Sequence, residues 1–334
     1  MAKNQKSEKI TIANLIAVVG IVLLLIFSYI GHSYMSGGEM GWDIVISVAI
    51  TAFTAFLLWF LIKAKGAENN LNLWKKVEYV TLALYILFAV PASLFGGIMH
   101  FFVVNDNKEN IKMYAEQDLA KIDKLFEDYK AFESEAVSRT GTGLQNATSS
   151  GHVCDEELNK FFEENRIQHT KESAQNFETL QRNALIGSGF EKFYENFLQQ
   201  RENIQSIVNG WSIIQIPMKS KQMSDLATSV QEELNKLSQN AQLPVITYNE
   251  YSGKYTLGEN QTSKFNIAGG VESFQFKKAM QEAEGFSVTA ILVVLLIHFL
   301  ILFNYIVAYR TSTLGITKNS EEDGGIILEF PRIR

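Results

Sequence analysis

The sequence predicts a mainly α-helical membrane protein. It has four transmembrane helices, and a mostly helical domain with a few short strands is inserted between the third and the fourth. Two observations predict this fold class. Of the 334 residues, 47% are hydrophobic, and many of these are concentrated in four long uncharged runs. Between the third and fourth runs lies a polar, acidic stretch that holds most of the charge. The length would suit two average soluble domains, but the apolar runs exclude an ordinary soluble protein.

Each apolar run is long enough for one membrane-spanning helix. About 20 residues, at a rise of ~1.5 Å each, cross the ~30 Å hydrocarbon core. The first run continues through Tyr29 and Ile30, which is longer than the apolar part of a cleaved signal peptide, so we expect an uncleaved anchor. The predicted order begins with a tail (1–11) and three spans within 12–104 (12–33, 44–62 and 80–104). The inserted domain (105–285), a fourth span (286–309) and a second tail (310–334) follow.

Lysine and arginine near the span ends predict the orientation. Outside the inserted domain they occur only in the first tail, in the loop between spans two and three, and in the last tail; 32–43 contains none. Four spans place all of them on one side, so we expect cytoplasmic termini and an outer domain. Cys154 is the only cysteine, so no disulfide staples that domain, as is ordinary for a bacterial periplasmic domain. We therefore expect a multi-pass protein of the bacterial inner membrane, with 105–285 in the periplasm.

The spans contain few polar groups, and His298 is the most notable of them. No Asp, Glu, Lys or Arg lies in the middle of any run, whereas His298 lies near the centre of the fourth span, with Asn304 further along. An ionisable group inside the membrane is a functional suspect by default. A single histidine does not make a proton relay, which needs a chain of groups. We expect a neutral His298 that is hydrogen-bonded across a helix interface, with proton conduction or sensing as the alternative.

Small residues recur at four-residue spacing in two spans, which lets helices approach closely. Pro91 removes a backbone donor, so we expect it to kink the third span. The small residues are Ser47, Thr51 and Ala55 in span two, and the pairs Ala92 and Gly96, and Ser93 and Gly97, in span three.

The inserted domain is predicted to be mainly helical from its apolar periodicity. Lys108–Ser138 reads as one helix that runs on from span three, because no Gly or Pro intervenes, and it is followed by a Gly- and Ser-rich break within 140–151. We expect further helices at 155–166, 170–186, 188–209, 219–240 and Val271–Ala283, the last leading into span four. Short strands are expected at Trp211–Ile216, Val245–Tyr248, Lys254–Leu257 and Lys264–Ile267, with a hairpin turn at Tyr251–Lys254.

Aromatic residues at helical spacing predict the core of this domain. Roughly 180 residues suffice for a core without disulfide staples. The predicted core residues are Phe161, Phe162, Phe177, Phe190, Phe193, Tyr194 and Phe197.

The charge of the inserted domain bears on its partners. Residues 105–285 contain 19 Lys and Arg against 27 Asp and Glu. An acidic surface disfavours nucleic acid and anionic lipid headgroups, so we expect no nucleic acid. The expected contacts are membrane lipid around the spans and other envelope proteins around the acidic domain.

The sequence contains no recognisable catalytic constellation. It has no HExxH, no glycine-rich phosphate loop with a lysine, no GxSxG and no paired CxxC. The best local group is His152, Cys154 and Asp155, which could hold a metal but more simply forms a loop with a lone thiol. We expect a protein that is not an enzyme and that has no cofactor and no metal.

The C-terminal tail predicts a docking peptide. A polar, acidic linker is followed by a short β-prone stretch, which could add a strand to a sheet edge of a cytosolic partner. The alternative is that it folds against its own chain or stays disordered. The residues predicted to dock are Ile326, Ile327, Leu328, Phe330, Arg332 and Arg334.

In architecture the chain resembles TssN-like proteins, inner-membrane components of the type VI secretion systems of Bacteroidetes. The resemblance lies in the length, in three spans followed by a helical periplasmic domain and a closing span, and in a composition rich in Lys, Asn and Glu. It covers the whole chain without a diagnostic motif, so it assigns no functional residue. It implies a structural part of a trans-envelope complex that joins periplasmic partners to a cytosolic baseplate, as a homo- or hetero-oligomer.

Two other classes of function stay open. A membrane receptor would detect a ligand with its periplasmic helices, although the chain has no cytosolic output domain. A channel or transporter is disfavoured by the lack of charge within the spans.

Overall fold

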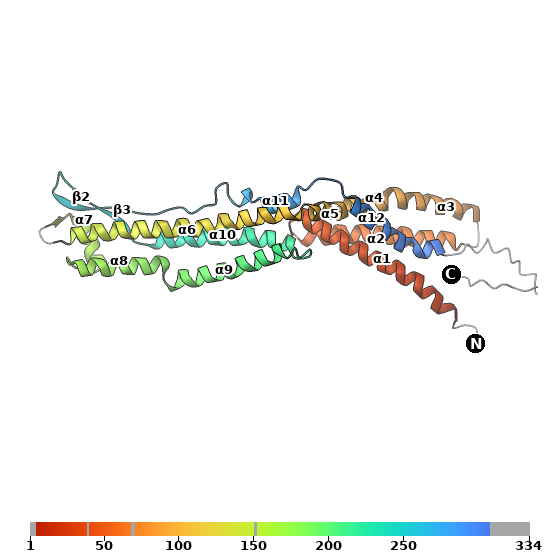
Figure 1. Cartoon of the computed structure of the whole chain (residues 1–334), viewed down its shortest axis with the longest axis horizontal. Helices are drawn as coiled ribbons and strands as arrows, with labels where there is room; N and C mark the ends of the chain where they lie inside the picture. The colour runs from red at the N-terminus through yellow and green to blue at the C-terminus, as the bar shows by residue number, and fades with distance from the viewer. Residues whose placement is uncertain (1–4, 39, 68–70, 150–151, 308–334) are drawn as a thin grey trace, which may run out of the picture. The chain divides into compact units, whose positions relative to one another are not determined.

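The computed structural model describes residues 5–38, 40–67, 71–149 and 152–307 (Figure 1). It confirms the mainly α-helical class, with few short strands and with four helices long and apolar enough to cross a membrane. The chain is therefore a multi-pass membrane protein. The residues predicted to dock a cytosolic partner (Ile326, Ile327, Leu328, Phe330, Arg332 and Arg334) lie outside the described part.

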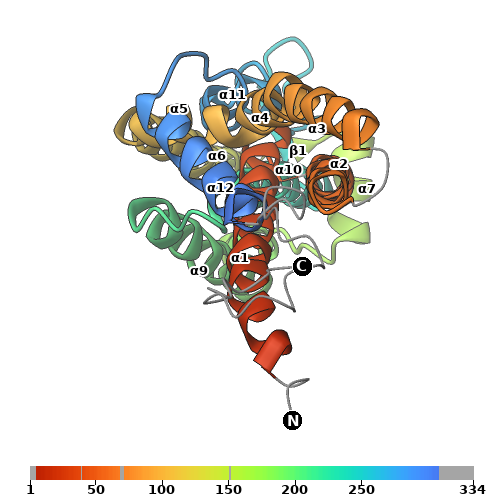
Figure 2. The same ribbon diagram turned by 90° about the vertical axis from the view of Figure 1, so that its right-hand side faces the viewer.

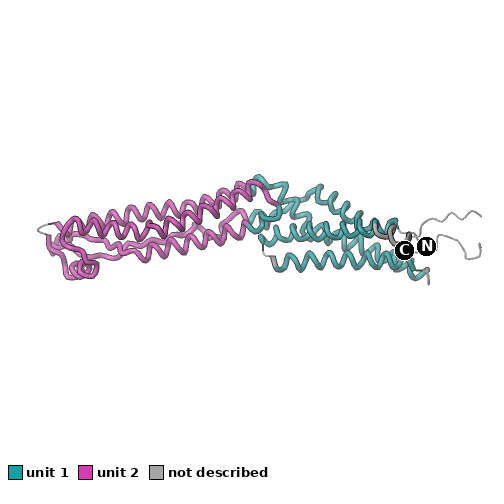
Figure 3. Tube along the Cα trace, turned by 90° about the horizontal axis from the view of Figure 1, so that it is seen from below, with its two compact units in different colours: residues 1–111, 213–218, 277–334 teal, residues 112–212, 219–276 magenta. Residues whose placement is uncertain are grey.

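The chain divides into two compact units, which Figure 3 colours separately. Unit 1 comprises residues 1–111, 213–218 and 277–334, and unit 2 comprises 112–212 and 219–276. Unit 1 contains the four candidate spans, Ile12–Ser36, Gly41–Lys65, Asn72–Asp106 and Val288–Val307. Its elements are α1 (Gln5–Ser36), α2 (Met40–Lys65), α3 (Leu71–Leu84), η1 (Tyr85–Ala89), α4 (Val90–Ser93), η2 (Leu94–Ile98), α5 (Met99–Asp106) and α12 (Val288–Val307).

The helix of the third span begins well before the predicted start at residue 80. The additional turns contain Lys75, Lys76 and Glu78, which interrupt the apolar run without interrupting the helix. An apolar run marks the part of a helix suited to hydrocarbon, whereas the backbone helix can continue beyond it.

The interior of unit 1 is formed by large apolar side chains from all four spans. Figure 2 shows α1, α2, α3 and α12 from one end, and α1 packs against both α2 and α12. Outward-facing side chains such as Phe95 and Leu296 stay exposed, as expected for helix faces that lipid covers. The fully buried core includes Leu24, Leu61, Tyr85, Ala89, Ile98 and Ile301.

The third span departs from α-helical geometry in two places. A π-helical turn precedes Pro91, and Gly96 and Gly97 have non-helical backbone angles. Pro91 has no N–H to donate, and the preceding turn widens into η1, a π-helix that the N–H of Val90 closes on the carbonyl of Tyr85. One turn later Gly96 (φ −80°, ψ 40°) and Gly97 (φ 113°, ψ −33°) break the helix. The expected kink therefore lies after Pro91 rather than at it, because only glycine adopts the backbone angles of Gly97 readily.

Unit 2 is built on the long helix α6 (Lys108–Ala147), whose first residues belong to unit 1. Asn107 (φ −98°, ψ 11°) separates α6 from α5, so α6 and span three are not one continuous helix. The predicted break at 140 is wrong, because α6 continues through Gly141 and Gly143 to Ala147. The other helices are α7 (Glu156–Glu164), α8 (Lys171–Ile186), α9 (Ser188–Asn209), α10 (Ile216–Asn240), the short 3₁₀ helix η3 (Val271–Ser273) and α11 (Gln275–Gln281).

A three-stranded sheet accompanies these helices in the order β1-β3-β2. The antiparallel hairpin of β2 (Pro244–Asn249) and β3 (Lys254–Asn260) confirms the two strands predicted there, and Gly253 (φ 64°) lies in its turn. β1 (Val153–Cys154) is not among the strands predicted from the sequence, and it pairs in parallel with β3.

The two other predicted strands are wrong. Residues 211–215 form the turn that follows α9, with Trp211 in the left-handed region (φ 49°), and Ile216 is the first residue of α10. Lys264–Ile267 is extended but pairs with side chains of α10 instead of a strand: Asn235 Oδ1 accepts from the N–H of Phe265 at 2.8 Å, and Gln231 Oε1 accepts from that of Ile267 at 2.7 Å. The helix predicted at Val271–Ala283 is interrupted at Phe274 and ends at Gln281, so it does not continue into α12.

The predicted aromatic core is largely confirmed. Phe162, Phe177, Phe190 and Phe197 are buried, whereas Phe161, Phe193 and Tyr194 are half-buried. The ring of Phe126 on α6 contacts four aromatic rings of α9, at centroid distances from 4.5 to 6.1 Å. Aromatic packing therefore holds α9 against α6.

Candidate functional site

His298, the polar residue that the sequence singled out, lies in a buried cluster between α12 and the third span. Its Nδ1 lies 2.8 Å from the hydroxyl of Tyr85, and its Nε2 lies 2.6 Å from Oγ of Ser93. The Tyr85 ring meets the imidazole edge-on, with centroids 5.4 Å apart. Tyr85 and Ser93 are completely buried and His298 is 3% exposed. The cluster thus joins the fourth span to the third by two side-chain contacts.

A serine beside a histidine can also be a nucleophile and its base, so the direction of the protons matters. Oγ of Ser93 also lies 2.5 Å from the carbonyl oxygen of Ala89, one turn earlier in its own helix. One arrangement satisfies every group: Tyr85 donates to Nδ1, Nε2–H donates to Ser93, and Ser93 donates to Ala89. In this arrangement a neutral imidazole donates to the serine instead of taking its proton. The geometry favours a polar contact that fixes the helices.

Three further polar contacts involve the last turns of α12. Nδ2 of the buried Asn304 donates to Oδ1 of Asn14 on α1. The hydroxyl of Tyr305 donates to Glu78 of α3 at 2.8 Å, and Nζ of Lys65 on α2 donates to the carbonyl of Tyr305 at 2.6 Å. With His298 included, α12 makes polar contacts with each of the other three spans. The fourth span is therefore fixed in register within unit 1.

Replacing His298 with alanine tests this interpretation. The substitution leaves the buried hydroxyl of Tyr85 without its imidazole partner and opens a cavity, so we expect it to lower the free energy of unfolding by about 1–3 kcal/mol. The matched control is Phe299→Ala, which shortens the neighbouring side chain on the exposed face of α12. The measurement is thermal unfolding in one detergent, together with proton flux in liposomes. A proton flux in the unmodified protein that His298→Ala abolishes would contradict the structural role.

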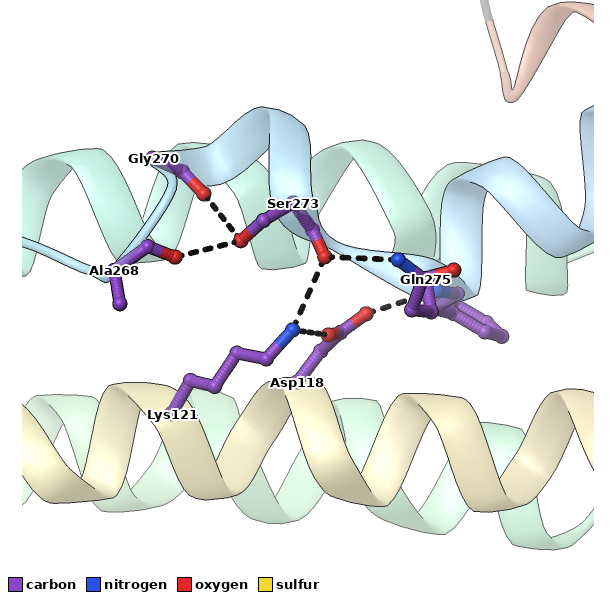
Figure 4. Close-up of polar contacts among 7 residues, drawn as sticks. Asp118, Lys121, Ala268, Gly270, Ser273 and Gln275 are labelled. Carbon is purple, nitrogen blue, oxygen red and sulfur yellow. Dashed lines mark hydrogen bonds and ion pairs between the residues drawn. The ribbon is translucent and has the colours of Figure 1, made fainter.

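Asp118, on α6 of unit 2, forms a second buried polar cluster (Figure 4). This carboxylate has no exposed surface. Its Oδ2 accepts from the backbone N–H of Phe276 at 2.8 Å, and its Oδ1 accepts from Nζ of Lys121 at 2.7 Å. Lys121 also donates to the carbonyl of Ser273 at 3.1 Å. Asp118 and Lys121, one turn apart on α6, thus hold the segment around Ser273 and Phe276, which precedes span four.

Further polar contacts connect α6 to α9 and α8. Arg201 on α9 donates from Nε and Nη2 to the carboxylate of Asp123, each at 2.8 Å. Such a two-pronged contact fixes direction as well as distance. The hydroxyl of Tyr129 donates to the carbonyl of Leu185 at 2.9 Å, in the last turn of α8. α6 is therefore the element to which the other parts of unit 2 attach.

Glu133 is a buried carboxylate on the same helix and is less well satisfied. Nη1 of Arg182 lies 3.2 Å from its Oε1, but the orientation does not form a hydrogen bond. Burial raises the pKa of Glu133 above the ordinary range, and the charge of Arg182 opposes this only in part. Folding therefore favours the protonated form of this carboxyl group.

The stability of the protein should depend on pH through Glu133. Because its pKa is raised on folding, its contribution to stability is present below the ordinary glutamate pKa of about 4.3 and is lost as the pH rises through the raised value. We expect Glu133→Gln to be more stable than the unmodified protein at neutral pH, with a difference that shrinks on acidification. Thermal unfolding of both proteins across this pH range measures it. A difference that is constant with pH would show that Glu133 does not titrate in this way.

His152, Cys154 and Asp155 are the best local group for a metal in the sequence. In the structure each has a local partner: His152 Nδ1 lies 2.7 Å from the carbonyl of Asn146, and Asp155 caps α7 by accepting from the N–H of Leu158. Burial raises the pKa of the Cys154 thiol, which disfavours the thiolate that binds metals. Within 5–38, 40–67, 71–149 and 152–307, no three His, Cys, Asp or Glu side chains gather as a metal site would require.

A groove between α9 and α10 is a candidate binding site in unit 2. It encloses about 750 Å³, and amide side chains form much of its lining. Nζ of Lys219 crosses part of it to reach Oδ1 of Asn203 at 2.6 Å and Oε1 of Gln222 at 2.7 Å. A polar ligand would have to replace these contacts.

Comparison of the chain with protein-family models, with curated proteins and with solved structures finds no match.

Proposed function

We propose that the protein is a non-enzymatic structural subunit of a multiprotein complex that crosses the bacterial envelope. In this proposal it lies in the inner membrane with cytoplasmic termini, and the domain between spans three and four faces the periplasm. The acidic surface of that domain binds other envelope proteins. The architectural resemblance to TssN-like proteins points to the membrane complex of a type VI secretion system, joined to its cytosolic baseplate.

The observation that carries this proposal is the set of contacts made by Asp118 and Lys121. The chain leaves span three at Asp106 and enters α6 at Lys108, and it enters span four at Val288 soon after Phe276. Asp118 and Lys121 bind Phe276 and Ser273, so the segment leading to span four is fastened to the helix that follows span three. Two membrane attachments are thereby combined in one folded unit. A connector that bears load between compartments needs this property.

The contacts of α12 support the same proposal. His298, Asn304 and Tyr305 make polar contacts with each of the other three spans, and the buried groups around His298 form a closed set of hydrogen bonds. A fixed bundle suits a scaffold better than a transporter, whose helices move past one another.

Deleting residues 325–334 should release a cytosolic partner. The deleted stretch contains the apolar residues Ile326, Ile327, Leu328 and Phe330, which are suited to strand addition. The four candidate spans all precede this stretch, so membrane insertion should be unchanged. The measurement is recovery of crosslinked partners by mass spectrometry, and the control replaces the acidic Glu321 and Glu322 of the linker with glutamine. Equal recovery of cytosolic partners with and without the tail would refute docking.

A receptor is the second candidate, and the groove between α9 and α10 is the observation that favours it. A ligand there would contact Asn203, Lys219 and Gln222. If the protein is a receptor, Asn203→Leu should abolish a response to that ligand while leaving the protein folded. A scaffold requires no such response.

A further inference from the structure

The turn between α9 and α10, taken here together with the first three residues of α10, belongs in part to the membrane-spanning unit. Residues 213–218 are part of unit 1, together with the four spans. The stretch from Ser212 to Met218 carries no charge, and three of its residues are isoleucine. The strand predicted at Trp211–Ile216 is absent, so these isoleucines are not part of a sheet.

The turn is attached to the end of α1. The hydroxyl of Tyr34 donates to the carbonyl of Ile213 at 3.1 Å. Gly38 lies so close to Pro217 that a Cβ at Gly38 would be 2.7 Å from the carbonyl oxygen of Pro217. Tyr34 is completely buried and Gly38 is also buried. The turn is therefore held against the last residues of the first span.

This attachment determines the depth of the turn relative to the bilayer. The apolar part of the first span begins at Ile12, and about 20 residues cross the hydrocarbon core, so the core ends near Ser33. Tyr34 then lies in the interfacial layer, where tyrosine and tryptophan are enriched. The backbone of Ile213 is within hydrogen-bond distance of Tyr34 and lies in the same layer.

At this depth the turn exposes apolar side chains. Ile214 is 66% exposed, and Ile213 and Met218 are also exposed. Two large apolar residues begin spans at this end of the same unit: Trp42, 76% exposed, near the start of α2, and Phe286, 69% exposed, just before α12. Apolar side chains are thus exposed on the turn and at the starts of two spans of the same unit.

We propose that Ile213, Ile214 and Met218 insert into the lipid interface, so that this turn is an additional membrane anchor. The ligand is the bilayer itself, at the boundary between headgroups and acyl chains, where exposed isoleucine and methionine lose contact with water. The inserted part of the chain then has a third attachment to the membrane, besides its links to α5 and α12. This inference does not depend on the proposed function.

A fluorescent label at position 214 tests the anchor in the full-length protein. The background is Cys154→Ser, which removes the single thiol, and Ile214→Cys then carries an environment-sensitive fluorophore in phosphatidylcholine vesicles. Two matched labels bracket the result: Leu296→Cys on the exposed face of α12, and Leu180→Cys, 65% exposed on α8 of unit 2. Vesicles with a nitroxide at a shallow acyl position measure contact with lipid, and iodide measures contact with water.

We expect the shallow nitroxide lipid to quench the label at 214 several-fold more strongly than the label at 180, and iodide to quench it less. Two results would overturn the proposal. Quenching by iodide equal to that at 180 would place the turn in water. Protection from both quenchers would mean that protein, such as a second copy of this chain, covers the turn. A label at Met218 repeats the test from a second position in case Ile214→Cys does not fold.

Discussion

Replacing Gly31 with alanine is expected to destabilise the membrane-spanning unit severely. Gly31 lies in α1 where this helix meets the break in the third span, and a Cβ at this position would overlap the backbone carbonyl group of Gly97. Backbone atoms cannot rotate away as the end of a side chain can, and Gly97 holds a conformation (φ 113°) that few other residues adopt. The helices must separate to admit the methyl group, which costs about 1–3 kcal/mol or more in a packed interior.

Gly41 provides the matched control for this prediction. It lies near the start of α2, and a Cβ there would meet nothing within 4 Å. Thermal unfolding of purified protein in one detergent should show a clear loss for Gly31→Ala and no loss for Gly41→Ala. Equal unfolding temperatures for the two variants would mean that α1 and the third span do not approach each other as closely as described.

Replacing Asp118 with alanine is expected to cause the largest loss of stability in unit 2. The carboxylate is fully buried and binds both the N–H of Phe276 and the ammonium of Lys121. Its removal leaves a buried backbone donor without its acceptor and a cation without its counter-charge. Removing one partner of a buried ion pair typically costs about 3–5 kcal/mol. Because Lys121 is partly exposed and can reach water, we expect the lower end of this range, about 3 kcal/mol.

Glu135→Ala is the control for Asp118→Ala, on the same helix. Glu135 pairs with Arg139 at 2.8 Å, but both side chains are largely exposed, so the loss should be under about 1 kcal/mol. The loss of stability for Asp118→Asn should lie between these two, because the amide oxygen can still accept from the N–H of Phe276. Chemical unfolding of the full-length protein, followed by tryptophan fluorescence and circular dichroism, measures all three. A loss for Glu135→Ala as large as that for Asp118→Ala would remove the special role of the buried carboxylate.

The glycines of α6 show why the predicted domain differs from the structure. From the sequence, Gly141 and Gly143 predict a helix break, because glycine weakens helices. In the structure they allow close packing: a Cβ at Gly141 would overlap the side chain of Glu178, and one at Gly143 would lie 2.8 Å from Cβ of Ile246. A single sequence does not distinguish these two uses of glycine, because the second depends on residues far along the chain.

Extended segments were predicted less well than helices for a related reason. Val245–Tyr248 and Lys254–Leu257 are joined by a short turn, so their pairing is local and the prediction succeeded. In Lys264–Ile267, backbone N–H groups donate to the side chains of Gln231 and Asn235, which lie 30 to 36 residues earlier in the sequence. Local periodicity carries no information about such partners.

The candidate sites were predicted only in part. His298 stood out because ionisable residues are rare within spans, but its partners Tyr85 and Ser93 are ordinary residues there. The sequence positions of Asp118 and Glu133 carry a recognisable signal. Both lie on the apolar stripe of α6: Asp118 is seven residues after Ile111, and Glu133 is four residues after Tyr129. A carboxylate at such a position is buried when the stripe is buried.

The measurement that tests the proposed scaffold role most directly is purification of the protein from its native membrane in mild detergent after crosslinking, with mass spectrometry of what is recovered. The proposal predicts several envelope proteins together with cytosolic baseplate proteins, crosslinked to unit 2 and to the C-terminal tail respectively. Recovery of the chain alone, or only as a homo-oligomer, would contradict it and would favour a receptor or a channel.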